Sequence, residues 1–370
     1  MTTTTHIITG ATGLVGSALV LELGTRTDAR LICLVRTHGH DDARTRLRGI
    51  LRSAAHAYLV PPAQTERILR RVTVIPGIDL TADLRGLPLP AGTGRTEFWH
   101  CAARMLFRER ERRGNFATNA AGTRRALTLA EQLRTTAFNL ISTAYVAGRA
   151  QGTVTEQAIT DPQGRNPYER SKMAAERIAL TANGRMFVRI LRPSIIVGHS
   201  TTLRYVAKPA GAYSGQSLIA AFYRTAGRSF RHEPCRIQVT PDEPFNIVPI
   251  DHVVREAVDI SQRPSASGVF HLTNPTPPST GDFIRACVAN AGGAEPRFVQ
   301  DSGWLSPRDR VLHDMLSVYH AHINNCQHFD RTRCDAAVVD PSVAAWHLAP
   351  ETLRGLFRPF AQRRPSAHTD

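Results

Sequence analysis

Lysine is almost absent from this chain, because 44 of its 46 basic residues are arginine and only Lys172 and Lys208 are lysine. Cysteine is also sparse, and the six cysteines lie far apart without a CxxC pair or Cys/His ligand spacing, which argues against a disulfide framework and a zinc site. No apolar run approaches the roughly 18 residues that a membrane span needs. The N-terminal MTTTTHIITGATG shows no export signal. We therefore expect a globular, cytoplasmic protein with no metal site and no membrane span.

The formal charge is strongly positive, at +15 over 370 residues. Such a charge raises nucleic acid or an acidic protein as a partner. The arginines are dispersed, however, and the run RERERR at 108–113 alternates in sign, which is typical of a solvated helix face. We expect no nucleic-acid partner and keep an acidic protein as a hypothesis.

Strand-like and helical patterns alternate through the first half of the chain. Residues 6–36 read as a strand, a glycine-rich turn, a helix and a second strand, which is one βαβ unit. Further strand-like runs lie at 72–75, 97–100, 137–141, 186–191 and 268–272, and helical periodicity covers 41–55, 115–135 and 167–183. This alternation predicts an α/β fold, a Rossmann-type doubly wound parallel sheet covered by helices on both faces.

The pattern becomes less regular after residue 198, where prolines and glycines cluster. We predict a dinucleotide-binding Rossmann domain over 1–198, with core segments returning near 245–272. A smaller, mostly C-terminal substrate-binding lobe is expected over 199–244 and 273–370. No oligomeric state follows from these patterns.

The segment GATGLVG, from Gly10 to Gly16, lies directly after the first predicted strand and opens the first predicted helix. Glycines at 10, 13 and 16 permit a tight turn and let backbone N–H groups approach a pyrophosphate at the helix N-terminus. The whole segment, with Thr12, Leu14 and Val15, is expected to contact a dinucleotide.

The end of the second predicted strand bears on the choice of cofactor. An acidic residue there would bind the ribose 2′-hydroxyl, but Val35 is followed by Arg36, whose guanidinium suits a 2′-phosphate. We therefore expect NADPH rather than NADH. Asp79 and Leu80 follow the third strand, where the carboxylate can approach the adenine amino group or simply cap a helix.

Tyr168 and Lys172 form the sharpest local signal, because an i, i+4 spacing places both on one face of a predicted helix. The ammonium is expected to lower the pKa of the tyrosine toward neutrality, so that Tyr168 acts as a general acid toward a carbonyl oxygen. A surface Tyr and Lys is the alternative. Upstream, Ser142 and Thr143 follow a predicted strand and offer a hydroxyl to the same carbonyl.

These residues together resemble an extended short-chain dehydrogenase/reductase. By register with that family Thr143 is preferred over Ser142. Asn119 resembles the asparagine of the family's proton relay, although an ordinary asparagine on a helix face is the alternative. Pro193, in LRPSIIVG, resembles the loop beside the nicotinamide, although a proline there also ends a strand. His100, His199 and His252 have no metal partner at useful spacing, and we expect them to be structural.

One subgroup of this family, the acyl-thioester reductases, is the most similar. The segments that carry this resemblance are LVR at 34–36, Arg46-Leu47, Arg67-Ile68, VTVIP at 72–76, Asp79-Leu80, HCAA at 100–103, STAYVAG at 142–148, FNIVPIDHV at 245–253, VFHLTNPTPPS at 269–279 and Phe329-Asp330. The resemblance implies that Ala102 contacts the cofactor and that Lys172 orients its ribose.

The resemblance also implies an activity. Such enzymes reduce an acyl group, held as a thioester on an acyl or peptidyl carrier protein or on coenzyme A, to an aldehyde and sometimes onward to an alcohol. No adenylation or carrier domain is visible, so we expect the partner to be supplied in trans.

Two other functions remain open at this stage. The first is an extended-family enzyme that acts on a ketone, an aldehyde or a nucleotide sugar and uses the same catalytic residues. The second is a non-catalytic dinucleotide-binding regulator, for which Tyr168→Phe would change nothing.

Overall fold

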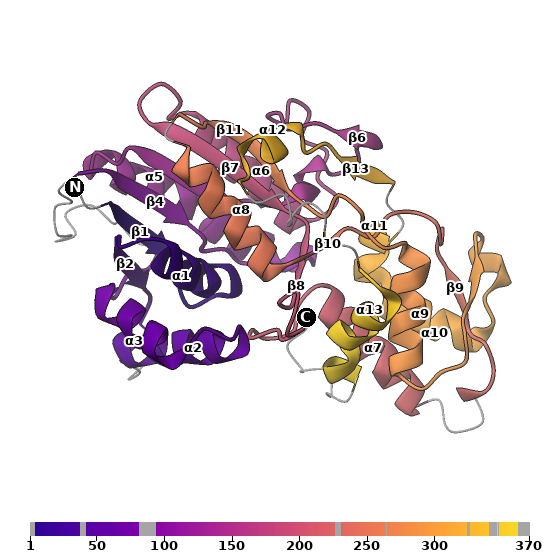
Figure 1. Ribbon diagram of the computed structural model, residues 1–370. Helices are drawn as coiled ribbons and strands as arrows, with labels where there is room; N and C mark the ends of the chain where they lie inside the picture. The colour runs from indigo at the N-terminus through magenta and orange to yellow at the C-terminus, as the bar shows by residue number, and fades with distance from the viewer. Residues whose placement is uncertain are drawn as a thin grey trace.

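The computed structural model describes residues 4–37, 42–80, 94–225, 231–263, 265–323, 326–339, 346 and 348–361. Its centre is a seven-stranded sheet with the order β11-β7-β5-β4-β1-β2-β3, in which every neighbouring pair is parallel. The strands are β1 (Thr5–Thr9), β2 (Arg30–Val35), β3 (Val72–Pro76), β4 (Thr96–His100), β5 (Ala137–Ile141), β7 (Phe187–Pro193) and β11 (Gly268–Leu272). The predicted Rossmann-type sheet is confirmed (Figure 1).

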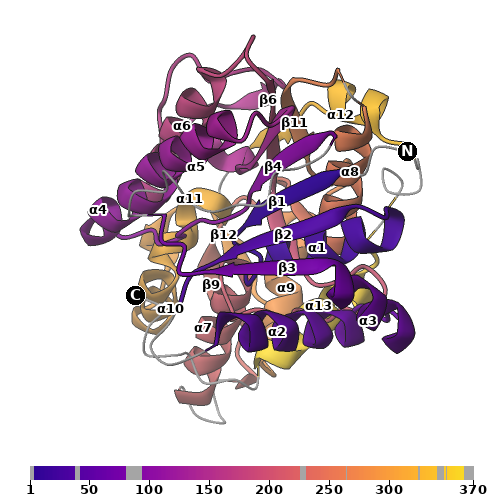
Figure 2. The same cartoon turned by 90° about the vertical axis from the view of Figure 1, so that its left-hand side faces the viewer.

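Helices cover both faces of this sheet (Figure 2). One face packs against α1 (Leu14–Arg26), α2 (Ala43–Ala57), α3 (Pro62–Arg71) and α8 (Ile250–Gln262). The other face packs against α5 (Gly122–Gln132) and α6 (Pro167–Leu180). The sequence analysis missed α3, although Thr65, Ile68 and Leu69 place apolar or small side chains on one buried face of it.

A lobe beside the sheet has its own apolar core (Figure 1). It contains α7 (Ala212–Thr225), β9 (Arg236–Gln238), α9 (Thr280–Asn290), β12 (Arg297–Val299), η5 (Ser302–Trp304), α10 (Pro307–Met315), η6 (Ser317–Tyr319), α11 (His320–Ile323) and α13 (Pro350–Ala361). Phe245, Phe283, Leu312 and Phe357 are among its buried residues. These elements lie within the residues for which a substrate-binding lobe was predicted. Binding of a substrate there stays a prediction.

Two segments differ in position from the prediction: 245–250, which was expected to return to the core, and 327–337, which was expected in the lobe. Within 245–250 only β10 (Ile247–Pro249) is a strand, and it pairs with β8 (Ile195–Val197) in a separate two-stranded sheet, because β11 takes the place beside β7. Farther along, β13 (Gln327–Phe329) pairs with β6 (Gly152–Val154), and α12 (Thr332–Ala337) contacts α8 and β11. This C-terminal stretch therefore lies on the Rossmann core and not in the lobe.

The charged run at 108–113 forms η1 (Glu109–Glu111) and the start of α4 (Arg112–Asn115), which continues through a π-helical turn, η2 (Phe116–Ala121), into α5. Arg104 pairs with Glu111 at 2.6 Å and Arg112 approaches Glu109 at 3.9 Å. Arg112 and Glu109 are largely exposed, as a solvated charged face requires. Among the residues that the structure describes, no helix is long and apolar enough to cross a membrane.

Candidate active site

Residues that are scattered in the sequence meet at one edge of the sheet. Gly10, Arg36, Ala102 and Thr143 directly follow or closely follow β1, β2, β4 and β5, and Pro193 ends β7. Because all these strands are parallel, their carboxyl ends lie at the same edge. The strand order reverses between β1 and β4, which is where doubly wound sheets bind their ligands.

The glycines of the first turn are required by close backbone contacts. Gly10 has φ +70°, and a Cβ on it would lie 2.5 Å from the Ala102 nitrogen. A Cβ on Gly16 would lie 2.2 Å from the Gly10 carbonyl oxygen, so no larger side chain fits between strand and helix. Helix α1 begins after its N-cap residue Gly13, which makes no side-chain hydrogen bond to the first N–H groups of the helix. This cradle fits a pyrophosphate.

Two arginines meet at the end of β2. Arg36 is exposed there, and the Arg46 guanidinium reaches back from α2 to donate to the Arg36 carbonyl oxygen. Arg46 Nη1 is buried and has no hydrogen-bond partner among the described residues. Asp79 is half-buried after β3, while Leu80 packs in the apolar cluster beneath α5. The donor set at this corner fits a phosphate.

The local sequence positions Tyr168 and Lys172 on α6. Asn166 caps the helix by accepting the backbone N–H of Glu169 at 2.9 Å, and Pro167 occupies its first turn. Lys172 is 2% exposed, and its Nζ donates to the Ile141 carbonyl oxygen at 2.6 Å. Tyr168 is half-buried, with its ring against Phe107.

The expected lowering of the Tyr168 pKa is corrected by the structure. Burial, and then the negative charge of Glu169, raise the pKa of Tyr168 well above its usual value of 10. The Lys172 ammonium donates to the Ile141 carbonyl oxygen, and burial lowers its pKa. Tyr168 therefore keeps its proton at neutral pH, which is the form that a general acid needs.

A chain of buried polar groups lies behind Lys172. Burial lowers the pKa of Lys172 to about 8, and the charge of Glu176 opposes that change. The Glu176 carboxylate accepts from Arg192 at 3.0 and 2.6 Å and from the Ser142 hydroxyl. Arg192 is fully buried and also lies 3.4 Å from His271 Nε2. Glu176 thus joins Lys172, Ser142 and Arg192.

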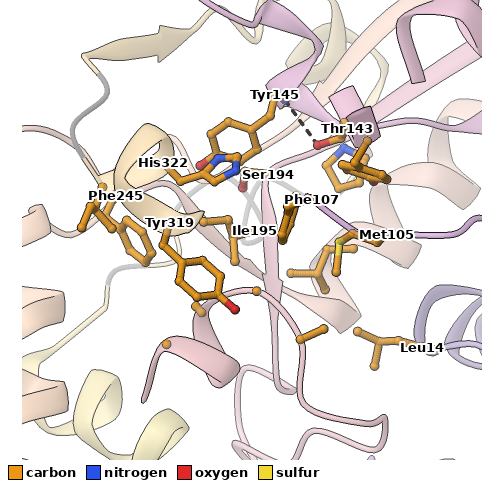
Figure 3. Close-up of a pocket in the computed structure, with 18 of the residues that line it drawn as sticks. Leu14, Met105, Phe107, Thr143, Tyr145, Ser194, Ile195, Phe245, Tyr319 and His322 are labelled. Carbon is orange, nitrogen blue, oxygen red and sulfur yellow. Dashed lines mark hydrogen bonds between the residues drawn. The ribbon is translucent and has the colours of Figure 1, made fainter. Parts of the chain in front are cut away.

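The same contacts separate the two candidate hydroxyls. Ser142 donates its proton to Glu176. Thr143 Oγ1 instead accepts the backbone N–H of Tyr145 at 3.3 Å, and among the described residues none accepts the Thr143 hydroxyl proton. Thr143 lines the cavity (Figure 3). Ser142 and Tyr168 line it too, but the Ser142 hydroxyl is already bonded to Glu176. The geometry supports the predicted choice of Thr143.

Asn119 lies in the π-helical turn and is 1% exposed. Its side chain bonds the backbone N–H and C=O of Arg104, both at 2.8 Å, and donates to the Ser171 hydroxyl at 2.8 Å. It does not line the cavity. Asn119 therefore ties the loop after β4 to the helix that carries Tyr168 and Lys172, and its role in a proton relay stays a prediction.

The cavity between sheet edge and lobe has a volume of about 270 Å³. Leu14, Val15, Cys101 and Pro193 line the end that faces the glycine turn. The other end penetrates the core of the lobe, where it is lined by Ile219, Phe245, Phe283, Ile284 and Leu316. The catalytic candidates Thr143, Tyr168 and Lys172 also line this cavity. Such a space can enclose an apolar group next to a reacting carbonyl.

The three histidines expected to be structural differ in their surroundings. His100 is 1% exposed and bonds the hydroxyls of Thr9 and Thr123 at 2.8 and 3.1 Å, which confirms a structural role. His199 and His252 each lie 3.9 Å from Asp251. Over the described residues, no group of three or more His, Cys, Asp or Glu side chains could hold a metal ion.

Comparison with known families decides the class of the protein. The family model NAD_binding_4, described as Male sterility protein, matches residues 8–257. The chain belongs to this family of extended short-chain dehydrogenases/reductases. This reductase is accordingly an NAD(P)-dependent oxidoreductase.

Individual relatives agree with this assignment. The chain is 28% identical over 324 residues to the nonribosomal peptide synthetase asaC of Aspergillus flavus, a match over 80% of this chain and 29% of that protein. The terminal R domain of the myxalamid PKS-NRPS pathway superposes with a TM-score of 0.75 at 23% identity, over 96% of this chain and 90% of that domain. UDP-glucuronic acid 4-epimerase from Bacillus cereus, bound to NAD, superposes at 0.64 and 17% identity, over 99% and 100%.

The structural and sequence similarities support the fold more strongly than they support a particular reaction. At such identities the two structures show the fold alone, and reductase and epimerase share it. The chain also spans less than a third of the length of the curated relatives that it matches. The reaction must therefore be argued from the site itself.

Two residues of this site were not indicated by the sequence patterns, and a third was named without a role. Arg46 entered only through the family resemblance, whereas Glu176 and His322 were not singled out. Glu176 lies one helical turn after Lys172, so the i, i+4 spacing could have indicated it. His322 had no local signal, because only the packing of α11 brings it to the cavity.

The pH dependence of the reaction is expected to reflect Lys172. Activity should fall as pH rises through about 8, because Lys172 then loses the charge that assists Tyr168. In Glu176→Gln this fall should occur about one pH unit lower, since an adjacent carboxylate raises the pKa of an ammonium. Profiles of kcat/KM against pH test this. Glu131→Gln, which removes a carboxylate paired with Arg185 on the surface, is the control, and identical profiles for wild type and Glu176→Gln contradict it.

Proposed function

We propose that this protein reduces an acyl thioester to an aldehyde, with NADPH as the reductant and an acyl or peptidyl carrier protein, or coenzyme A, as the thiol carrier. One observation carries the proposal: Thr143 and Tyr168 line a cavity that is also lined by apolar residues from the core of the lobe. A site for an apolar acyl chain beside a carbonyl-directed acid is what a thioester reductase needs. Matches to peptide synthetases support the same reaction.

A bound nicotinamide cofactor would supply a hydride to the carbonyl carbon of the thioester. The Thr143 hydroxyl is placed to donate to the oxygen that becomes negative, and Tyr168 holds the proton that neutralises it. Cleavage of the C–S bond then releases the thiol and leaves the aldehyde. Lys172 supplies positive charge behind Tyr168, and the apolar lining keeps water from the reacting carbonyl.

The preference for NADPH rests on the two arginines at the end of β2. Arg36→Ala and Arg46→Ala are each expected to raise the KM for NADPH about tenfold, because a charge-assisted hydrogen bond to phosphate is worth about 1.5–3 kcal/mol. The KM for NADH, which has no 2′-phosphate, should change little. Arg70→Ala, an exposed arginine on α3, is the matched control. Equal losses with both cofactors contradict this assignment.

The reaction itself is tested with purified protein, NADPH and a panel of acyl-coenzyme A and acyl-pantetheine thioesters. We expect NADPH consumption to match the release of free thiol and of aldehyde trapped as a hydrazone. Free aldehydes and ketones are assayed in parallel. Turnover of aldehydes or ketones without any thioester turnover would instead establish a carbonyl reductase, the alternative that uses the same catalytic residues.

A further inference from the structure

The reaction cavity contains a histidine whose ring nitrogens hydrogen-bond to none of the described residues. His322 lies in α11, and neither its Nδ1 nor its Nε2 hydrogen-bonds to any residue that the structure describes. Nε2 is 3.9 Å from the Glu169 carboxylate, which is beyond hydrogen-bonding distance. Glu169 is already bound by Arg165 at 2.9 Å and by Asn166 at 3.1 Å. Buried polar atoms without a partner are rare in folded proteins, so this side chain points to a ligand.

Aromatic rings surround His322. Its ring centroid lies 5.0 Å from that of Tyr145 and 5.6 Å from that of Phe107, both edge-on or tilted. Its side chain is 11% exposed. Burial, and then the positive charge of Arg165, lower the pKa of His322 to about 3, so the ring is neutral. A neutral imidazole offers one hydrogen-bond donor and one acceptor.

The position of His322 relates it to the substrate and not to the cofactor turn. Figure 3 shows it between Thr143 on one side and Phe245 and Tyr319 on the other, within the same cavity. Leu14 lies at the opposite end of the view, toward the glycine turn. A molecule whose carbonyl reached Thr143 and whose apolar chain reached Phe245 would therefore pass His322.

We propose that His322 hydrogen-bonds a secondary amide of the substrate and selects thioesters that carry one close to the reacting carbonyl. The inference rests on the proposed thioester reduction and names the chemistry that the site recognises. An amide is neutral, offers both a donor and an acceptor, and can continue into an apolar chain. A charged group would be disfavoured in this lining, and a plain hydrocarbon would leave both ring nitrogens unpaired.

The amide has two possible sources, which the test must separate. It can belong to a peptide-type acyl group, or it can belong to the pantetheine arm that bears the thiol. Four thioesters cover both cases: nonanoyl or N-hexanoylglycyl as the acyl group, each joined to pentanethiol or N-acetylcysteamine. Within each pair the chain lengths match, and only the amide differs.

The measurement is kcat/KM for the four thioesters, with the Kd of each determined in the presence of NADP⁺, where reduction cannot occur. For the wild-type protein, an amide at one of the two positions, either in the acyl group or in the thiol, should raise kcat/KM about threefold to tenfold over the matching hydrocarbon. The Kd should fall by a similar factor. In His322→Phe this ratio should fall to about one, and His322→Gln, which keeps a donor and an acceptor, should retain part of it. His328→Phe, an exposed histidine on β13, is the control and should keep the wild-type ratio.

Thermal unfolding of each variant shows whether it is folded. If the wild-type protein reduces all four thioesters equally well, the inference about His322 is wrong but the proposed reductase function stands. The same holds if the amide advantage persists in His322→Phe. If none of the four is reduced while NADPH still binds, the reductase function fails and the inference with it.

Discussion

Replacing Tyr168 with phenylalanine is expected to lower kcat for thioester reduction by about 10²–10⁴-fold, the usual contribution of a positioned general acid. The variant removes only a hydroxyl, and the ring still packs against Phe107 at a centroid distance of 6.0 Å. Because the raised pKa keeps Tyr168 protonated, the lost atom is the proton donor itself. The measurement is single-turnover kinetics with saturating NADPH.

Two controls accompany this variant. Tyr58→Phe removes a hydroxyl from a tyrosine that stacks on His199 outside the cavity, and its kcat should stay near wild type. The affinity of Tyr168→Phe for NADPH should be within a few-fold of wild type, which separates lost chemistry from lost binding. A Tyr168→Phe enzyme that kept more than a tenth of wild-type kcat would contradict the proposed role and favour a non-catalytic protein.

Breaking the buried pair behind Lys172 is expected to cost most in stability. Arg192→Leu should lower the free energy of unfolding by about 3–5 kcal/mol, because it leaves the Glu176 carboxylate charged, buried and without its guanidinium. Urea denaturation, followed by circular dichroism, measures the change. The double variant Arg192→Leu/Glu176→Leu should recover part of the loss, since the unpaired carboxylate is removed while Lys172 loses its neighbouring negative charge and Ser142 its acceptor.

A surface pair provides the comparison. Arg185 and Glu131 are 2.7 Å apart but largely open to solvent, so Arg185→Leu should cost about 1 kcal/mol or less. The argument fails if Arg192→Leu is no more harmful than Arg185→Leu. A double variant that is less stable than Arg192→Leu would also contradict the prediction, because the remaining contacts of Glu176 would then stabilise the fold more than its unpaired charge destabilises it.

Much of the sheet could be predicted because its signals are local. Residues 6–36 contain, in order, a buried strand, a glycine turn, an apolar helix that is buried over most of its length, and a second buried strand, and they form β1, α1 and β2. The segment 245–250 is as apolar as a core strand, yet only Ile247–Pro249 is extended and it pairs with β8. An apolar run indicates burial, whereas the choice of strand partner depends on which edge is free once β11 has paired with β7.

The amino-acid sequence by itself determined the glycine turn, the Tyr168–Lys172 pair on one helix and the position of Arg36 directly after β2, since each needs only neighbours within a few residues. Only the tertiary structure decided that the hydroxyl of Ser142, which lines the cavity together with Thr143, donates to Glu176, and that Arg46 donates to the Arg36 carbonyl oxygen. It also decided that the pKa of Tyr168 is raised and that His322 lines the cavity. Burial and long-range contacts set these properties, and neither is encoded in a local spacing.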